Sequence, residues 1–513
     1  MIDILILGGT VVNGRGRSGK LNVGIRGSHI VLVSPKVLPS RNVIQASGKV
    51  VCPGFIDVHS HGDFILTHRA PFLGKVTQGV TTEIIGNCGI SAAPFSEKTL
   101  SFFREYAPLL GQRGRGRLWF SWEEYFQIIS RSALVTNIIP LVGHGNLKKL
   151  VAGYPEREGL EKMKAILKDS LDQGVWGFST GLIYDPGMFS RTEELIALAK
   201  VVAKAGGFYA THIRGEGENT LLPAIRETIT IGQKAEIAVQ VSHLKVANPT
   251  SGEKAKVVLE MLETARRNGL DITYDQYPYP AASTSLTALL PPWSRQGGWE
   301  KVKDTLADAQ KREQVSQQMR DGLLGWERII ISQVYTRVNR WMEGLTVKEI
   351  SSKKGREPVD LVLDLLEEEK GAVSMIYFSM TEAAVETFLR QPIGFIGTDG
   401  LPSRRPHPRL WGSFPRVLSY YVREKRLLTL EEAVEKMSQA PAKKFGLRER
   451  GEIKPGNVAD VVVFDPQAVK DEATFNQPTK RPSGIDWVLV NGKVVINCGR
   501  FTGSTPGKVL LKT

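Results

Sequence analysis

The feature that most constrains the fold is a repeated unit in the middle of the chain. A short apolar run ends at a polar residue, and a turn and a helical pattern follow. Short apolar runs are typical of buried strands, and apolar residues three and four apart are typical of amphipathic helices. Eight strand patterns end at His61 and at the ends of 82–88, 137–144, 175–180, 207–212, 237–243, 270–277 and 393–399. Helical patterns cover 160–173, 192–205, 220–234 and 254–268. Eight such units predict an α/β fold, a (β/α)8 barrel over residues 51–446.

The seventh strand of this barrel has two candidates. Residues 372–380 also form a strand pattern, so either that run or the run ending near Tyr277 completes the barrel. Between them, residues 281 to about 345 break the alternation with Pro291-Pro292, several tryptophans and a long polar helical pattern. We expect this segment to be an insertion in a position to cover the barrel mouth.

Both ends of the chain show short β-rich runs separated by turns. Residues 1–50 contain four such runs, and residues 447–513 contain a strand pattern at 458–464 and a hairpin with Asn491-Gly492 at its two-residue turn. Asn-Gly is favoured there because both turn residues need a positive φ. Each terminal piece is short for a core of its own, so we expect the two to combine into one small β-sandwich domain.

The composition is that of an ordinary globular enzyme, with 42% hydrophobic and 23% charged residues. The formal net charge of +14 is spread along the chain. The densest basic run, at 113–117 (RGRGR), has no interleaved aromatic residues, which favours a solvated loop over a nucleic-acid site. The sequence contains no apolar run of membrane-spanning length and no signal-peptide pattern. We therefore expect no nucleic-acid or membrane partner.

Three cysteines occur in the 513 residues: Cys52, Cys88 and Cys498. Such an odd and sparse set argues against a disulfide framework and fits a reducing compartment. We expect a cytoplasmic protein in which Cys52 and Cys498 are buried or neutral thiols.

Residue types that bind metal ions stand at the ends of the strand patterns. His59 and His61 are two residues apart in an extended run, so both imidazoles point to one face. His212 and His243 end two runs that would be neighbouring strands, and Cys88 ends the second strand. Because the active sites of (β/α)8 barrels lie at the carboxyl ends of the strands, we expect these side chains to converge there. Imidazole and thiolate are ligands of zinc.

Asp399 ends the eighth run, just before Gly400. Each of these residues has a structural interpretation when taken alone. An aspartate before glycine is usually a turn residue, and a buried cysteine usually behaves as a small apolar side chain. Four histidines, a cysteine and an aspartate that all lie at strand ends are difficult to explain in this way together. We therefore predict a metal site at the carboxyl face of the barrel.

The order of these residues resembles the amidohydrolase superfamily, whose members join a metal-bearing (β/α)8 barrel to a β-sandwich made from both termini. Longer motifs narrow the resemblance to the N-acyl-D-amino-acid deacylases, or D-aminoacylases. The motifs are 53–63 (PGFIDVHSHGD), 86–89 (GNCG), 177–184 (GFSTGLIY), 211–214 (THIR), 242–245 (SHLK), 275–279 (DQYPY) and 399–400 (DG). The resemblance covers nearly the whole chain. It implies zinc-dependent hydrolysis of a small substrate, an N-acyl-D-amino acid, to a carboxylic acid and a free D-amino acid.

The resemblance also implies two zinc positions. A tightly bound zinc would be held by Cys88, His212 and His243. A second, weaker position would be lined by His59, His61 and Asp399. Many amidohydrolases bridge two metals with a carboxylated lysine after the fourth strand, but residues 176–181 contain no lysine. Cys88 is the deacylases' alternative, and it separates them from hydantoinase-like and dihydroorotase-like relatives. Asp399 would act as general base toward water and then as general acid toward the departing amine.

For the α-carboxylate of the substrate, the resemblance implies contacts from Lys245, Tyr279, Ser283 and Arg409. Tyr277 is close enough in pattern to be the contacting tyrosine instead of Tyr279. Without the resemblance, Lys245 is equally well interpreted as a surface charge.

His144 stands in a further similar motif at 143–148 (GHGNLK), where many deacylases have arginine in place of Lys148. His144 is a candidate for a group that supports the metal ligands or polarises the substrate carbonyl, and a structural role is the alternative. The difference between Lys148 and the arginine of many deacylases affects the expectation for this loop and not that for the metal ligands.

Two other functions are compatible with these residues. One is a different amidohydrolase reaction, such as hydrolysis of a cyclic amide or a dipeptide. The other is a non-catalytic relative that kept the fold and binds a partner, although such a protein need not retain all of the ligands. The preferred side chain and acyl group, the occupancy of the second metal position and the oligomeric state are not determined by the sequence.

Overall fold

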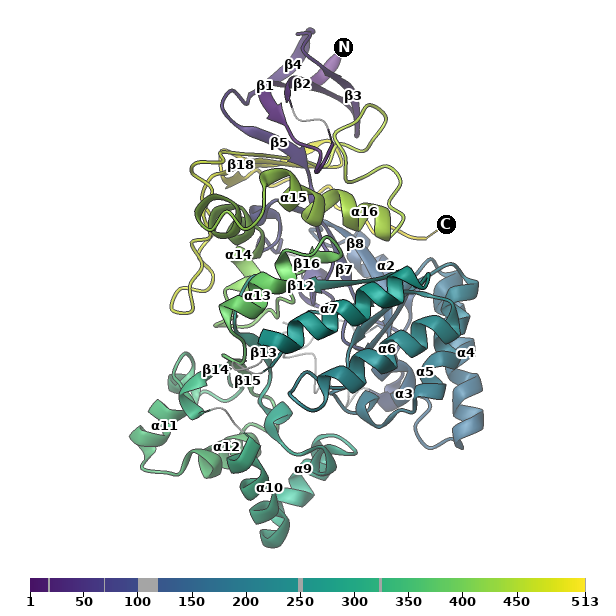
Figure 1. Ribbon diagram of the computed structural model, residues 1–513, viewed down its shortest axis with the longest axis vertical. Helices are drawn as coiled ribbons and strands as arrows, with labels where there is room; N and C mark the ends of the chain where they lie inside the picture. Colours follow the sequence, from purple (N-terminus) through teal and green to yellow (C-terminus); the bar gives the residue numbers. More distant parts are fainter. Residues whose placement is uncertain (17–18, 69, 100–118, 248–251, 323–324, 513) are drawn as a thin grey trace.

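The structure is a computed structural model that describes residues 1–16, 19–68, 70–99, 119–247, 252–322 and 325–512. The arginine-glycine run at 113–117 lies outside the described residues. Three parts follow one another down the long axis of the molecule in Figure 1: a β domain at the top, a barrel in the middle and a mostly helical part at the bottom.

A parallel sheet of eight strands forms the barrel. In sheet order the strands are β6 (Phe55–Asp57), β7 (Val80–Ile85), β8 (Asn137–Gly143), β9 (Gly177–Gly181), β10 (Phe208–His212), β11 (Ala238–Val241), β12 (Ile272–Gln276) and β16 (Gly394–Ile396). Every neighbouring pair along this path is parallel. The seventh strand is therefore the run that ends just before Tyr277, and the prediction of a (β/α)8 barrel is confirmed.

The first and last strands of this sheet meet at their carboxyl ends. Ser60 and Gly400 form a parallel bridge, and the backbone N–H of Asp399 donates to the carbonyl oxygen of His59 at 2.8 Å. These contacts nearly close the barrel, so the residues that follow β6 and β16 lie side by side.

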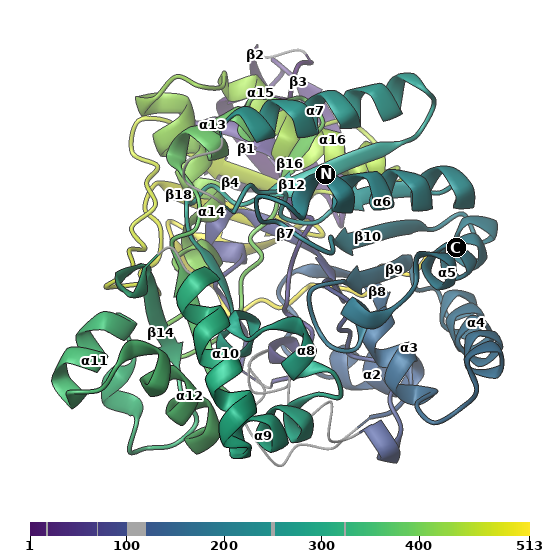
Figure 2. The same ribbon diagram turned by 60° about the horizontal axis from the view of Figure 1, so that its bottom comes forward.

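Helices surround the barrel, as Figure 2 shows for α4, α5 and α6. The four helical patterns of the sequence are found as α4 (Glu156–Asp172), α5 (Thr192–Lys204), α6 (Leu221–Ala235) and α7 (Gly252–Arg267). Each buries an apolar stripe; on α5 this stripe includes Leu195, Leu198 and Val202. Among the described residues this part also contains the α-helices α2 (Trp122–Ser130), α3 (His144–Leu150), α13 (Glu382–Leu389), α14 (Arg409–Arg416), α15 (Leu430–Val434) and α16 (Ala440–Lys444).

Both termini form one nine-stranded mixed sheet. Its strands are β1 (Ile2–Val11), β2 (Gly19–Arg26), β3 (His29–Ser34), β4 (Ser40–Gln45), β5 (Val50–Pro53), β17 (Val461–Phe464), β18 (Ile485–Val490), β19 (Lys493–Asn497) and β20 (Arg500–Phe501). β5 pairs with β17, and one apolar cluster contains Ile25 and Val51 together with Val461 and Leu489. The expected domain built from both termini is thus confirmed, because neither half encloses this cluster alone.

The segment between β12 and β16 contains a part with its own apolar core. Three antiparallel strands, in the order β13, β15, β14, form its sheet. They are β13 (Ala282–Ser285), β15 (Ser374–Tyr377) and β14 (Ile329–Gln333). Its helices are α8 (Pro292–Arg295), α9 (Trp299–Ala307), α10 (Ala309–Gly322), α11 (Val347–Lys354) and α12 (Pro358–Glu368). The strand pattern at 372–380 supplies the central strand here, so this hydrogen-bonded unit continues past residue 345 to Tyr377.

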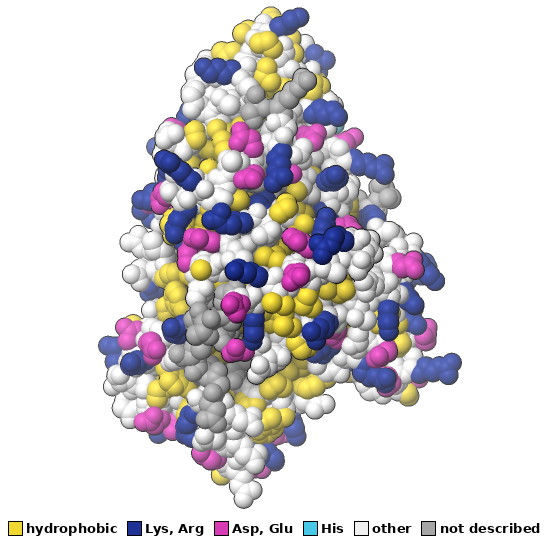
Figure 3. All heavy atoms as spheres, viewed as in Figure 1, with side chains coloured by type: hydrophobic (Ala, Val, Ile, Leu, Met, Phe, Trp, Pro, Cys, Tyr) yellow, Lys and Arg dark blue, Asp and Glu magenta, His cyan; other side chains and the backbone are white. Residues whose placement is uncertain are grey.

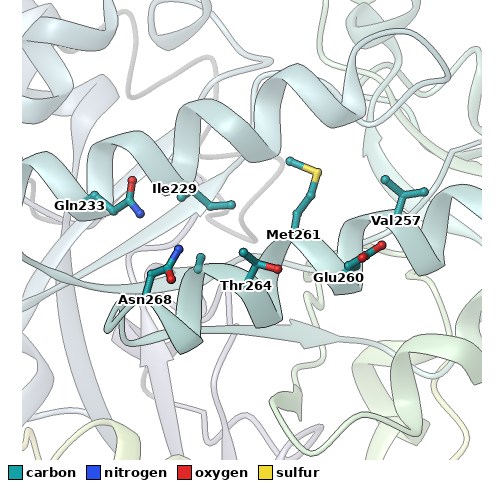
Figure 4. Close-up of a pocket in the computed structure, with 8 residues that line it drawn as sticks. Ile229, Gln233, Val257, Glu260, Met261, Thr264 and Asn268 are labelled. Carbon is teal, nitrogen blue, oxygen red and sulfur yellow. The ribbon is translucent and has the colours of Figure 1, made fainter.

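The surface carries dispersed charge. On the face shown in Figure 3, Lys and Arg side chains are scattered among Asp and Glu. No helix within the described ranges is both long and apolar enough to cross a bilayer. A pocket on the outside of the barrel lies between α6 and α7 (Figure 4). It is lined by Ile229, Gln233, Val257, Glu260, Met261, Thr264, Ala265 and Asn268. These residues belong to the outer helices and the turn after α7, so the pocket is separate from the strand ends.

Candidate metal centre

Cys88 lies among three imidazoles at the carboxyl ends of the barrel strands. Its Sγ is 3.3 Å from His59 Nε2, 3.4 Å from His243 Nε2 and 3.6 Å from His212 Nδ1. All four side chains are buried. A thiolate and imidazole nitrogens that converge in this way form a donor set suited to zinc.

His61 and Asp399 form a second group beside the first. Asp399 Oδ1 is 3.1 Å from His61 Nε2 and 3.5 Å from His59 Nε2. Two sets of potential ligand atoms result, each within 4.8 Å of one another: Cys88, His212 and His243 in one, and His59, His61, Cys88 and Asp399 in the other. The fold thus brings together all six side chains that were predicted as metal ligands, and Cys88 belongs to both sets.

Three of these residues have a backbone conformation that is uncommon for residues with a side chain. The φ angle is 53° at Cys88, 34° at His243 and 46° at Asp399. Each follows a barrel strand, β7, β11 and β16 respectively. Strain of this kind persists where the surrounding structure holds it, and it is concentrated at functional sites. Its repetition at three strand ends indicates that the fold sets these side chains for a ligand.

A carboxylate lies behind His59. Asp275 Oδ1 is 3.2 Å from His59 Nδ1, and it accepts a hydrogen bond from the backbone N–H of His243 at 2.8 Å. A carboxylate at the far nitrogen fixes the orientation and tautomer of a metal-binding imidazole. In the sequence, Asp275 is visible only as part of the motif at 275–279, and its position on a barrel strand is the signal that could have assigned it this role.

Lys75 joins the first and last strands next to the metal ligands. Its ammonium is 2.5 Å from Asp57 Oδ2 and also donates to the hydroxyl of Thr398, although the lysine is only 1% exposed. Asp57 in turn accepts from the backbone N–H of Thr398 at 2.8 Å and of His59 at 3.3 Å. Because Thr398 precedes Asp399, this network supports ligands from both strands. The sequence offers no signal for this role of Lys75.

The charges of the centre shift the pKa values of its acidic groups. Burial alone would raise the pKa of the Cys88 thiol, but His59 and His243 hold it well below its usual value. Burial likewise raises the pKa of Asp399, whereas the charges of Arg409 and of the histidines bring it well below its usual value. The charges of the centre therefore favour the anionic form of both groups, which is the form that binds a cation.

Arg409, Lys245 and Tyr277 lie beside Asp399. Arg409 Nη2 is 2.9 Å from Asp399 Oδ2 and donates to the carbonyl oxygen of Ser283 at 3.2 Å. The Tyr277 ring centroid is 4.3 Å from the Arg409 guanidinium and 5.9 Å from Lys245 Nζ. Within the described residues, Nε and Nη1 of Arg409 and the hydroxyl of Tyr277 are buried without a hydrogen-bond partner. Unpaired buried donors are costly, so this group of donors points to an anionic ligand.

The two candidate tyrosines have different surroundings. The Tyr279 ring is 4.9 Å from the guanidinium of Arg416, and its hydroxyl lies beside Gly412, also buried without a hydrogen-bond partner within the described residues. Tyr277 faces the site, and burial raises its pKa to about 12, so its hydroxyl keeps the proton that it can donate. The geometry favours Tyr277 over Tyr279 as the tyrosine of the anion site.

His144 begins α3. Its Nε2 is 2.9 Å from Glu194 Oε1, and Lys148 pairs with the other carboxylate oxygen. Burial would raise the pKa of Glu194, but His144 and Lys148 bring it to about 2. These contacts join α3 to α5 and favour the structural role of His144.

Fold and site together define a class of protein. A barrel with metal-binding side chains at its strand ends, joined to a β domain from both termini, is the architecture of the amidohydrolases. The family model described as "Amidohydrolase family" matches residues 325–496.

Three comparisons narrow this class. D-aminoacylase of Alcaligenes xylosoxydans xylosoxydans is 35% identical to the chain over 519 residues, with 100% of the chain and 98% of that protein covered. N-acyl-D-glutamate deacylase of the same organism is 35% identical over 508 residues, with 96% and 93% covered. A crystal structure of N-acyl-D-glutamate deacylase from Bordetella bronchiseptica, complexed with zinc and a phosphonate inhibitor, superposes with a TM-score of 0.84 at 34% identity and covers 99% of both chains. The chain belongs to the D-aminoacylase family.

Proposed function

We propose that this protein is a zinc-dependent amidohydrolase that cleaves N-acyl-D-amino acids into a carboxylic acid and a free D-amino acid. The observation that carries the proposal is the set of Cys88, His212 and His243, which lies next to Asp399. It occurs in a chain that matches D-amino-acid deacylases over its whole length.

The residues of the centre fit zinc. Three protein ligands leave one coordination position open, as a catalytic zinc requires. We assign Cys88, His212 and His243 to the tightly bound ion, and the remaining three side chains, His59, His61 and Asp399, to a weaker second position. Bound there, zinc polarises a carbonyl oxygen and lowers the pKa of water to about 7.

Asp399 is the residue to which we assign proton transfer. Arg409 and the histidines lower the pKa of its carboxyl group and so favour the anion, which lies in the ligand set with Cys88 and can accept a proton from the attacking water. The carboxyl group can then donate this proton to the nitrogen of the scissile amide. The leaving group is then a neutral amine and not an unstable amide anion. Arg409 contacts Oδ2 and holds the carboxylate while Oδ1 faces the histidines.

The α-carboxylate of the substrate is assigned to the donors beside Asp399. Lys245 is 4% exposed and lies 5.9 Å from the Tyr277 ring centroid, so it belongs to the site and not to the surface. Arg409 supplies two buried N–H groups that lack a partner within the described residues. Ser283 presents its carbonyl oxygen to Arg409, so we assign it to holding the arginine as well as to the substrate side.

The direct test is a panel of N-acetyl-D-amino acids and their L-enantiomers, assayed after chelation and after zinc is returned. We expect hydrolysis of D-substrates, loss of this activity with the chelator and recovery with zinc. Hydrolysis of hydantoin, dihydrouracil or dipeptides in place of these substrates would contradict the proposal. Purified protein that binds no zinc would favour a non-catalytic relative.

We also propose a division of the chain into a β domain (1–50 with 447–513) and a barrel (51–446) whose insertion covers the active site; the sequence places this insertion at about 281 to 345, and β15 extends it to Tyr377. Contacts of the insertion with the loop after β9 support this position. The hydroxyls of Tyr184 and Thr284 are 2.9 Å apart, and Arg295 donates to the carbonyl oxygen of Ile183 at 3.1 Å.

The three cysteines are free thiols, which supports a place in the reducing cytoplasm.

A further inference from the structure

Glu216 lies on the loop after β10, and its side chain turns back toward the metal centre. One oxygen, Oε1, is 2.5 Å from Lys245 Nζ, 3.2 Å from His212 Nε2 and 3.4 Å from His243 Nδ1. The carboxylate is 16% exposed. A single oxygen thus contacts two of the proposed zinc ligands and the proposed carboxylate-binding lysine. In the sequence, its position four residues after His212 is the only signal of this contact.

The two histidines use opposite ring nitrogens for Cys88 and for Glu216. His212 faces the sulfur with Nδ1 and the carboxylate with Nε2. His243 faces the sulfur with Nε2, and its Nδ1 lies 2.8 Å from the ammonium of Lys245, which can only donate, and 3.4 Å from the carboxylate. A neutral imidazole that gives a lone pair from one nitrogen carries its proton on the other. A carboxylate that accepts this proton fixes the tautomer and the ring orientation, and it makes the ligating nitrogen more basic.

The loop that carries Glu216 is held from several sides. The backbone carbonyl of Glu216 accepts from the N–H of Ala247 at 2.9 Å. Arg214, two residues earlier, pairs with Glu227 on α6 at 2.8 Å and donates to the carbonyl oxygen of Met188 at 2.8 Å. These contacts tie the loop to α6 and to the loops after β9 and β11. The carboxylate is therefore held by the fold and does not need a ligand to reach its place.

We propose that Glu216 is a positioning residue that sets the tautomer of His212 and at the same time holds Lys245 in place between His243 and the substrate carboxylate. The inference rests on the proposed zinc site and links zinc retention to substrate binding through one carboxylate. Loss of Glu216 should therefore weaken both zinc retention and substrate binding. Loss of Lys245 should weaken substrate binding and leave the contact of Glu216 with His212 in place.

The test compares Glu216→Gln with two matched variants. Glu218→Gln makes the same change at a 54% exposed carboxylate on the same loop, which pairs with Lys254, and Lys245→Met removes the lysine only. Three quantities are measured: zinc affinity by competition with a chelator, the visible spectrum of the cobalt-substituted protein, and kcat and KM for the best N-acetyl-D-amino acid. We expect Glu216→Gln to lose about 10- to 100-fold in zinc affinity, to change the cobalt spectrum and to raise KM. Lys245→Met should raise KM and lose less zinc affinity than Glu216→Gln, because it removes the hydrogen bond to His243 but keeps the carboxylate beside His212. Glu218→Gln should match the wild type.

A Glu216→Gln protein with wild-type zinc affinity and cobalt spectrum overturns the inference. Glu216→Asp, which keeps the charge but has a shorter reach, is measured in the same way and should fall between the wild type and the glutamine variant. If Glu216→Gln does not fold, Glu216→Asp decides: reduced zinc affinity supports the inference, and wild-type affinity overturns it. A wild-type protein that binds no zinc contradicts the proposed function itself, which distinguishes the two failures.

Discussion

At the scale of single residues, the two oxygens of Asp399 have different partners. Oδ1 lies between His59 and His61, whereas Oδ2 is 2.9 Å from Arg409. One oxygen is thus available on the metal side, and the other is held by a buried guanidinium. Changes at this residue should therefore separate catalysis from retention of the tightly bound zinc, whose proposed ligands are other side chains.

Asp399→Asn should abolish most turnover and leave the tightly bound zinc in place. The amide keeps the size of the side chain but cannot accept and return a proton, so we expect kcat to fall about 10²- to 10⁴-fold. Steady-state kinetics and the zinc content of the same preparation measure the two effects. Turnover like that of the wild type would show that another group transfers the proton.

Tyr277 and Tyr279 offer a matched pair of substitutions. Tyr277→Phe removes a buried hydroxyl that has no partner within the described residues, from a ring that lies beside Arg409 and Lys245. KM should therefore rise about tenfold or more with little change in kcat, as expected for a lost hydrogen bond to a charged group. Tyr279→Phe removes a hydroxyl that lies beside Gly412 and should leave KM unchanged. The reverse pattern in the kinetics would assign the substrate contact to Tyr279.

At the scale of elements, the strand ends of the barrel approach each other too closely for extra side-chain atoms. Gly89, directly after Cys88, has a φ of 75°, and a Cβ there would lie 2.6 Å from the backbone nitrogen of Gly181. A Cβ on Gly181 would in turn meet the carbonyl oxygen of Cys88. The loop after β7 and the end of β9 are therefore packed backbone against backbone, and this contact fixes where the Cys88 thiol lies.

Gly181→Ala should displace the loop of Cys88. The added methyl group would come closer than 3.0 Å to the Cys88 carbonyl oxygen, so the backbone has to shift. We expect a loss of stability of about 1–3 kcal/mol and a weaker affinity for zinc, measured by thermal unfolding and by metal analysis. Gly159→Ala in α4, where the new atom would meet side chains no closer than 3.5 Å, is the control and should retain zinc. Equal zinc affinity in both variants would contradict the importance of this backbone contact.

At the scale of the whole molecule, a buried polar network connects the barrel with the C-terminal part of the β domain. Asn137 begins β8, and its side-chain oxygen accepts from the amide of Asn491 at 2.8 Å and from the backbone N–H of Lys508 at 3.2 Å. Its side-chain amide donates to Asp460 at 3.3 Å, and Arg450 pairs with the same carboxylate. Every member has a partner, so the β domain is held to the barrel by specific contacts as well as by apolar burial.

The pH dependence of global stability should include a contribution from Lys436, which is 3% exposed and donates to the carbonyl oxygen of Gly394 at 3.2 Å. Burial lowers its pKa to about 8, against about 10.4 in the unfolded chain. Between these values the unfolded chain binds more protons, so the free energy of unfolding should rise with pH, by on the order of 1 kcal/mol per pH unit. Denaturant unfolding from pH 7.5 to 10 should show a smaller rise in Lys436→Met. The same change at the exposed Lys443 should leave the rise as it is in the wild type.

Much of the fold and of the metal centre can be predicted because it depends on local patterns. Strand and helix periodicities repeat along short windows of the sequence. Residues at the carboxyl ends of the barrel strands all lie at the same end of the barrel. For this reason the barrel, the terminal β domain and the convergence of Cys88 with the histidines follow from the order of residues alone.

Choices between similar local patterns needed the tertiary structure. The runs at 270–277 and 372–380 are equally strand-like, and only their hydrogen-bond partners place the first in the barrel and the second in the inserted sheet. Tyr277 and Tyr279 likewise differ only in what surrounds them. Asp275 and Glu216 gain their contacts with the histidines from other segments of the chain. Such contacts join distant parts of the sequence, and no local window of residues contains them.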